Sequence, residues 1–136
     1  KFKLELEWLI RLGVLRKNNE SRWTSPSFII PKKDSVVRFL MDFRKVNELL
    51  VRKPYPIPKI LDIMQTIQGF TYVKTLDLSM GYYSIRLTQS AQDICTIITP
   101  WGKYSYTRLP MGVMCAPDIF QEKMYGIMSF LEYLRT

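Results

Sequence analysis

With 136 residues, 47% of them hydrophobic, the chain is long and apolar enough for one packed domain, which argues against a disordered protein. It has no histidine, two cysteines and no apolar run near the roughly 20 residues of a membrane helix, so histidine catalysis, ordinary zinc sites, a disulfide framework and a membrane span are excluded within this segment. The net charge of +8 lies wholly in residues 1–59, which favours a polyanionic partner, nucleic acid before an acidic membrane, although a solubilising surface would carry the same charge.

The first half of the chain predicts one helix and one hairpin. Leucines and a tryptophan at helical spacing over residues 4–15 predict an amphipathic helix that ends near Gly13. The β-rich runs 28–30 and 36–43 predict a hairpin with a basic tip. Alternate prolines make residues 53–58 extended.

The second half predicts two helices, at residues 57–67 and 116–133, the first closed by Gly69 and the second with Pro117 in its first turn. It also predicts four strands, at residues 70–78, 85–87, 94–99 and 103–109, of which the last two form a hairpin. The fold class is therefore α+β, with a few antiparallel strands and helices packed on one face.

Asp77 is the most informative residue, because it ends an apolar, β-leaning run and begins a turn with a glycine and two tyrosines. This pattern predicts a carboxylate at the end of a buried strand, a position suited to metal-bound chemistry. From the local sequence alone, an acid that caps a turn is the simpler interpretation. The other acids of this half, Asp62, Asp93 and Asp118 among them, belong to different segments. Because the sequence starts at Lys1 and stops mid-pattern, we expect a fragment of a longer polypeptide.

Six motifs follow one another along the chain in a fixed order. They are Gly13-Val14-Leu15, Trp23-Thr24-Ser25-Pro26, Pro31-Lys32-Lys33-Asp34 with Arg38-Phe39-Leu40-Met41-Asp42-Phe43-Arg44-Lys45-Val46-Asn47, Tyr55-Pro56-Ile57-Pro58, Leu76-Asp77-Leu78-Ser79-Met80-Gly81-Tyr82, and Arg108-Leu109-Pro110-Met111-Gly112 with Ala116-Pro117-Asp118-Ile119-Phe120-Gln121. In this order and spacing they resemble the reverse transcriptase of gypsy-type long-terminal-repeat retrotransposons and, more distantly, of retroviruses.

The resemblance implies a fragment of the right-hand polymerase fold. Residues 1–54 would be part of the fingers subdomain, and residues 55–136 would be fingers and palm, ending before the aromatic-x-Asp-Asp hairpin that supplies further carboxylates. The implied activity is RNA-directed DNA polymerisation, with two-metal transfer of deoxynucleotides onto a primer. Asp77 and the backbone carbonyl of Leu78 would bind metal, and the complete enzyme would hold two Mg²⁺ ions, with Mn²⁺ as the alternative.

The resemblance also implies a nucleotide site and a template–primer site. The nucleotide-binding residues would be Lys32, Lys33, Arg38, Gly81, Tyr82, Met111 and Gly112. One of the two lysines and the arginine would grip the triphosphate, and which lysine does so stays open. Tyr82 would exclude a 2′-hydroxyl, unless it is a core aromatic. Met111 stands where retroviral enzymes have glutamine, so it would pack rather than hydrogen-bond.

The template–primer residues implied by the resemblance are Asp42, Arg44, Pro117 and Gln121. For the first two, a structural ion pair is an equal alternative. The expected partners are an RNA or DNA template with primer, deoxynucleotides, and RNase H, integrase and protease domains of one polyprotein, without a membrane. A cytoplasmic particle or the nucleus is the expected location.

One carboxylate cannot hold two metal ions, so we expect the isolated chain to be inactive. The alternative is a decayed retroelement remnant that acts at most as a non-catalytic basic module for nucleic acid. Binding of that kind would weaken steeply as the salt concentration rises.

Overall fold

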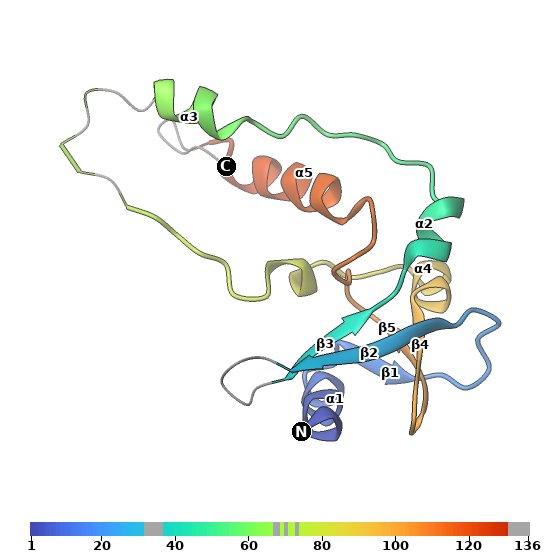
Figure 1. Ribbon diagram of the computed structural model, residues 1–136. Helices are drawn as coiled ribbons and strands as arrows, with labels where there is room; N and C mark the ends of the chain where they lie inside the picture. The colour runs from blue at the N-terminus through green and yellow to red at the C-terminus, as the bar shows by residue number, and fades with distance from the viewer. Residues whose placement is uncertain (32–36, 67–68, 70, 73, 131–136) are drawn as a thin grey trace.

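A computed structural model describes residues 1–31, 37–66, 69, 71–72 and 74–130 of the chain (Figure 1). Its helices are α1 (Phe2–Arg11), α2 (Arg44–Leu49), α3 (Ile60–Thr66), the 3₁₀ helix η1 (Gly81–Ser84), α4 (Gln89–Ile94) and α5 (Ala116–Met128). Its strands are β1 (Leu15–Lys17), β2 (Ser25–Pro31), β3 (Val37–Met41), β4 (Thr96–Thr99) and β5 (Gly102–Tyr106). The strands form one sheet in the order β1-β5-β4-β2-β3.

Both predicted hairpins are confirmed. β2 pairs with β3 in antiparallel register, with Phe28 opposite Leu40. β4 pairs with β5 in the same sense, and Gly102 at the turn has φ +121°, a conformation that side chains disfavour. The predicted antiparallel sheet needs one correction, because β2 and β4 pair in parallel and make the sheet mixed.

The core lies between the sheet and α1. Its buried apolar residues come from α1, β1, α2, β4, β5, the first turn of α5 and the loops between these elements; they are Leu6, Leu9, Val14, Leu15, Phe43, Val46, Cys95, Ile97, Tyr104, Tyr106, Leu109, Val113 and Ala116. α1 is the first predicted helix, and it stops where Gly13 takes φ +68°. The sequence did not predict β1, α2 and α4, because these elements are too short to show a clear hydrophobic period.

Two of the predicted strands are wrong. The described residues between 70 and 78 form no strand, and Leu76 is 76% exposed. A β-rich run needs a neighbouring strand for its hydrogen bonds, and within the described residues this one has none. Residues 85–87 make only a bridge, in which Arg86 faces Arg108.

The remaining predicted helices are present with different bounds. α3 begins at Ile60 instead of residue 57, and α5 is helical to Met128, beyond which the predicted end at Tyr133 lies outside the described residues. No helix in the described part is long and apolar enough to cross a membrane.

Two regions can be distinguished by their packing. We call the described residues of 1–50 and 81–130 the body, and those of 51–80 the arm. In Figure 1 the arm leaves the body after α2, carries α3 outward and returns at η1. The sheet lies in the body, whereas Asp77 lies on the returning part of the arm.

Candidate active site

A hollow of about 360 Å³ lies where the arm returns to the body. It is lined by Leu76, Asp77, Leu78, Met80, Gly81, Tyr82, Met111 and Phe120. Five of the predicted site residues, Asp77, Leu78, Gly81, Tyr82 and Met111, are therefore brought together from two motifs that lie far apart in the sequence.

The turn after Asp77 has an unusual backbone. Met80 has φ +55° and ψ +36°, a left-handed conformation that costs a residue with a side chain roughly 1–2 kcal/mol. The carbonyl of Met80 accepts a hydrogen bond from the backbone N–H of Tyr83 at 2.9 Å, which closes the turn. This turn carries the chain from the exposed Asp77 into η1, and strain of this kind is common at functional sites.

Phe120 of α5 fixes the position of η1. A Cβ atom on Gly81 would lie 2.9 Å from two atoms of the Phe120 ring, so only glycine fits there without movement. The Tyr82 ring meets Phe120 edge to face, with centroids 5.1 Å apart. Tyr82 is thus half-buried against α5, and Phe120 lines the hollow in addition to packing.

A second loop forms another side of the hollow. Met111 lines it, 54% exposed, and Gly112 follows with φ +91°, again in the left-handed region. Asn47 of α2 holds this loop from both sides. Its Nδ2 donates to the Gly112 carbonyl at 2.9 Å, and its Oδ1 accepts from the N–H of Met114 at 2.8 Å. Sequence reasoning missed this role of Asn47, although the residue closes one of the six motifs.

The predicted triphosphate residues are described only in part. Lys32 and Lys33 lie outside the described residues. The backbone of Arg38 lies in β3, opposite Ile30. Their roles stay predictions.

Asp42 and Arg44 form an ion pair, the structural alternative given above. Their closest atoms, Oδ2 and Nη2, are 2.6 Å apart, and the Arg44 backbone N–H also donates to Oδ1. Hydrogen bonds from Arg44 lower the pKa of the Asp42 carboxyl to about 2. A contact with template is untested.

The other two predicted template–primer residues, Pro117 and Gln121, lie in α5 and outside the lining of the hollow. Between them, Asp118 is 2% exposed, and it accepts hydrogen bonds from Arg52 Nε at 2.8 Å and from the Tyr55 N–H at 3.0 Å. The Arg52 guanidinium, and then the Tyr55 N–H, hold the pKa of this carboxyl below its usual value. Asp118 therefore ties the start of the arm to α5. The sequence signal for it is slight: one acid in the first turn of an apolar helix.

The metal-binding capacity of the hollow is limited. Its lining includes Asp77 and Leu78, and a carboxylate and a backbone carbonyl are hard oxygen ligands of the type that Mg²⁺ prefers. Among the residues that the structure describes, no group of three or more His, Cys, Asp or Glu could hold a metal ion. These two oxygens therefore fit as part of a ligand set.

Comparison with known proteins decides the family. Residues 30–133 match the model of the family described as reverse transcriptase (RNA-dependent DNA polymerase). The chain belongs to the reverse transcriptase family. Members of this family generally depend on a divalent metal.

The related sequences are retroelement polyproteins. The Pol polyprotein of transposon 412 from Drosophila melanogaster is 35% identical over an alignment of 118 residues, and the match covers 82% of this chain and 10% of that protein. The Pol polyprotein of transposon gypsy from the same organism is 31% identical over an alignment of 130 residues, and the match covers 91% of this chain and 12% of that protein. The chain thus spans about a tenth of the length of the curated relatives it matches.

The fold agrees with that of solved reverse transcriptases. The prototype foamy virus protease–reverse transcriptase has a TM-score of 0.87 and 25% sequence identity, with 98% of this chain and 18% of that chain covered. A foamy viral protease–reverse transcriptase in complex with an RNA/DNA hybrid has a TM-score of 0.81 and 24% identity, with 96% and 18% covered. The predicted fold class, a partial polymerase fold of the α+β class, is confirmed.

Proposed function

We propose that the chain supplies one wall of the active site of an RNA-directed DNA polymerase, which adds deoxynucleotides to a primer on an RNA or DNA template. The observation that supports this best is the meeting of Asp77, Tyr82 and Met111 at a single hollow. Residues 1–54 would be fingers and residues 55–136 fingers and palm. Protease, RNase H and integrase domains would share the polyprotein.

In this proposal, Asp77 and the Leu78 carbonyl contribute oxygen ligands to Mg²⁺. Two bound ions would activate the primer hydroxyl and neutralise charge on the triphosphate. Further carboxylates, the nucleotide and water would complete the ligand sets, since the hollow itself offers one carboxylate. Lys32 or Lys33, together with Arg38, would contact the triphosphate.

The choice of sugar would rest on Tyr82. Its ring is braced by Phe120 at 5.1 Å between centroids, so it cannot swing away freely from a substrate placed over Gly81. A 2′-hydroxyl would then collide with the ring. Met111 would pack beneath the nucleotide, and Asp42, Arg44, Pro117 and Gln121 would lie along the template and primer.

The test is a chimera in which this chain replaces the matching segment of the transposon 412 polyprotein. We expect Mg²⁺-dependent primer extension that Asp77→Asn abolishes and the matched variant Asp62→Asn, at an exposed acid of α3, leaves intact. Tyr82→Ala should raise the use of ribonucleotides relative to deoxynucleotides. Undiminished extension by Asp77→Asn would remove the role given to this residue.

The isolated chain is expected to show no extension, because one carboxylate cannot position two metal ions. Extension by purified residues 1–136 would contradict this expectation. It would also require further metal ligands within the chain.

A further inference from the structure

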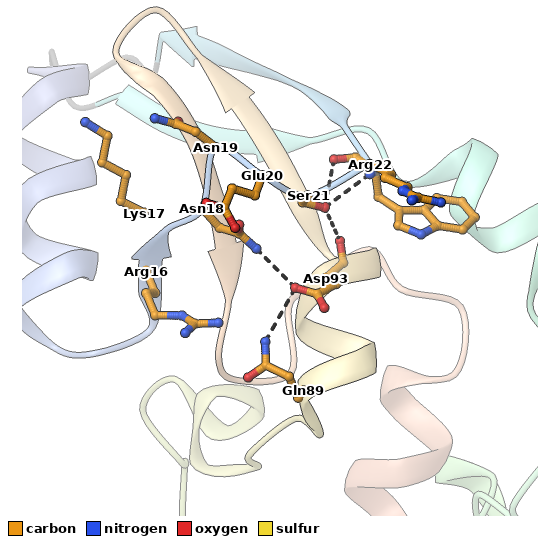
Figure 2. Close-up of a pocket in the computed structure, with 10 residues that line it drawn as sticks. Arg16, Lys17, Asn18, Asn19, Glu20, Ser21, Arg22, Gln89 and Asp93 are labelled. Atoms are coloured by element: carbon orange, nitrogen blue, oxygen red, sulfur yellow. Dashed lines mark hydrogen bonds between the residues drawn. The ribbon is translucent and has the colours of Figure 1, made fainter.

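A second, larger hollow lies in the body, and it shares no residue with the candidate active site. Its volume is about 870 Å³, and it lies between α4 and the loop that joins β1 to β2 (Figure 2). The residues that line it are Arg16, Lys17, Asn18, Asn19, Glu20, Ser21, Arg22, Trp23, Gln89 and Asp93. Nothing in the proposed polymerase chemistry uses this site.

The floor of this hollow is built from fixed polar groups. Ser21 is buried, and its hydroxyl donates to the Asp93 carbonyl at 2.8 Å and accepts from the Trp23 N–H at 3.1 Å. Asn18 Nδ2 donates to the Asp93 carboxylate at 3.1 Å and to the Ser105 hydroxyl at 2.9 Å. The Asp93 charge is therefore partly satisfied by amide donors, and the loop is held to α4 and β5.

Cations lie at both ends of the hollow. Figure 2 shows Arg16 and Lys17 on one side and Arg22 on the other, with the amide side chains between them. The side chains of Lys17 and Arg22 make no ion pair or hydrogen bond with any residue that the structure describes, and the Arg16 side chain makes one long hydrogen bond to Gln92, at 3.4 Å. Cations spread along a hollow suit a chain of phosphates, whereas a single phosphate would need them to converge.

An aromatic ring accompanies these cations. Trp23 lines the hollow and is 39% exposed, although its backbone is fixed through Ser21. An exposed ring next to spaced cations is the combination that binds single-stranded nucleic acid, because an unpaired base can stack on the ring while phosphates meet the cations. A paired base presents no free face for such stacking.

We propose that this hollow binds a single-stranded stretch of nucleic acid, with phosphates at Arg16, Lys17 and Arg22 and one base on Trp23. The inference does not rest on polymerase activity, since the site lies outside the candidate active site. Within the hollow, Glu20 opposes binding through its negative charge.

The test is fluorescence anisotropy with the 136-residue chain and a labelled mixed-sequence 12-nucleotide single-stranded DNA, titrated across a range of salt concentrations. The double variant Arg16→Ala, Arg22→Ala should weaken binding and flatten the slope of log affinity against log salt by about 1.4, that is, about 0.7 for each phosphate that the variant no longer neutralises. Trp23→Ala should weaken binding by about tenfold, and Trp23→Phe should keep most of the affinity. Glu20→Gln should tighten it.

The matched control is Arg11→Ala, which removes an exposed arginine of α1 that does not line the hollow. An equal loss of affinity in Arg11→Ala and Arg16→Ala would mean diffuse attraction by the basic half and would overturn the site. A duplex that binds as tightly as the single strand, or competition by inorganic phosphate at the oligonucleotide's own concentrations, would also overturn it. Asp77→Asn should leave this binding unchanged, so failure here and failure of the polymerase proposal are distinguishable.

Discussion

The body and the arm differ in how they hold their residues. In the body, Ile97 and Tyr106 have no exposed surface, and the sheet and α1 enclose a continuous apolar cluster. In the arm, Leu61 is 71% exposed, and the described residues around Asp77 belong to no helix or strand. The loop with Met111 is therefore positioned by the packed body and by the Asn47 hydrogen bonds, whereas Asp77 depends on the contacts at two points, one at each end of the arm.

Those two points are chemically different. The start of the arm is held by hydrogen bonds and charge, through Arg52 and Tyr55 on Asp118. The residue that directly follows the arm, Gly81, is held by shape, because it fits closely against Phe120. Either contact can be altered by a substitution outside the buried core, so the difference between the body and the arm can be tested at both ends of the arm.

The largest effect should come from Leu109→Ala in the body. Leu109 belongs to the buried cluster, so removing its side chain leaves a cavity and should lower the free energy of unfolding by about 2–5 kcal/mol. The same substitution in the arm, Leu61→Ala, should change it by less than about 0.5 kcal/mol, because the side chain is exposed. Urea unfolding followed by circular dichroism measures both. Equal losses of unfolding free energy in the two variants would show that Leu61 is packed as tightly as Leu109, and would contradict the distinction between body and arm.

The next largest effect is expected at the close contact between Gly81 and Phe120. Gly81→Ala places a Cβ 2.9 Å from the Phe120 ring, so α5 or η1 must shift, and we expect a loss of about 1–3 kcal/mol. Gly126→Ala is the matched control in α5, where an added Cβ meets nothing within 4 Å. It should stabilise the chain by about 0.5–1 kcal/mol, because alanine favours the helix. Thermal unfolding should thus move in opposite directions for the two variants, and a shift in the same direction would contradict the tight fit at Phe120.

A smaller effect is expected at the loop of the body. Asn47→Ala removes both the donor to Gly112 and the acceptor for Met114, and it should cost about 1–2 kcal/mol. Asn47→Asp keeps the acceptor for Met114 but places a carboxylate oxygen against the Gly112 carbonyl, so it should cost at least as much. Hydrogen exchange of the Met114 amide is the direct measurement. Unchanged protection in Asn47→Ala would mean that the loop is held by its packing alone.

The body was more predictable from sequence than the arm. Alternating β-branched and aromatic residues around turn signals are enough to predict the hairpins β2–β3 and β4–β5, because the pairing there is local. The parallel pair β2·β4 joins segments far apart in the chain, and no local pattern encodes it. The expected strand over residues 70–78 failed for a similar reason, since a strand is made by its partner as much as by its own residues.

The residues of the candidate active site also differ in how far the sequence predicted them. The family resemblance implied five residues of the hollow, and they lie in two motifs that each have a turn of their own, at Met80 and at Gly112. Asn47 and Asp118, which hold the motifs together, were missed because their hydrogen bonds span more than 60 residues of chain. Residues that act within a motif can be read from sequence, whereas residues that join motifs require the fold.

The smallest effect on the free energy of unfolding is expected at the ion pair between Arg52 and Asp118. Arg52 is half exposed, so solvent weakens its pairing with Asp118. Because the pKa of Asp118 lies below its usual 3.8 in the folded chain, the folded state binds fewer protons there than the unfolded state. The ion pair therefore stabilises the arm above about pH 4, and this stabilisation disappears as the pH falls through the lowered pKa. The Tyr55 amide resonance should follow this titration with a midpoint below 3.8, and Asp118→Asn should abolish it while Asp62→Asn leaves it unchanged. A midpoint at or above 3.8 would mean that the arm is joined to α5 without the charge of Asp118, and that shape at Gly81 alone brings Asp77 to the hollow.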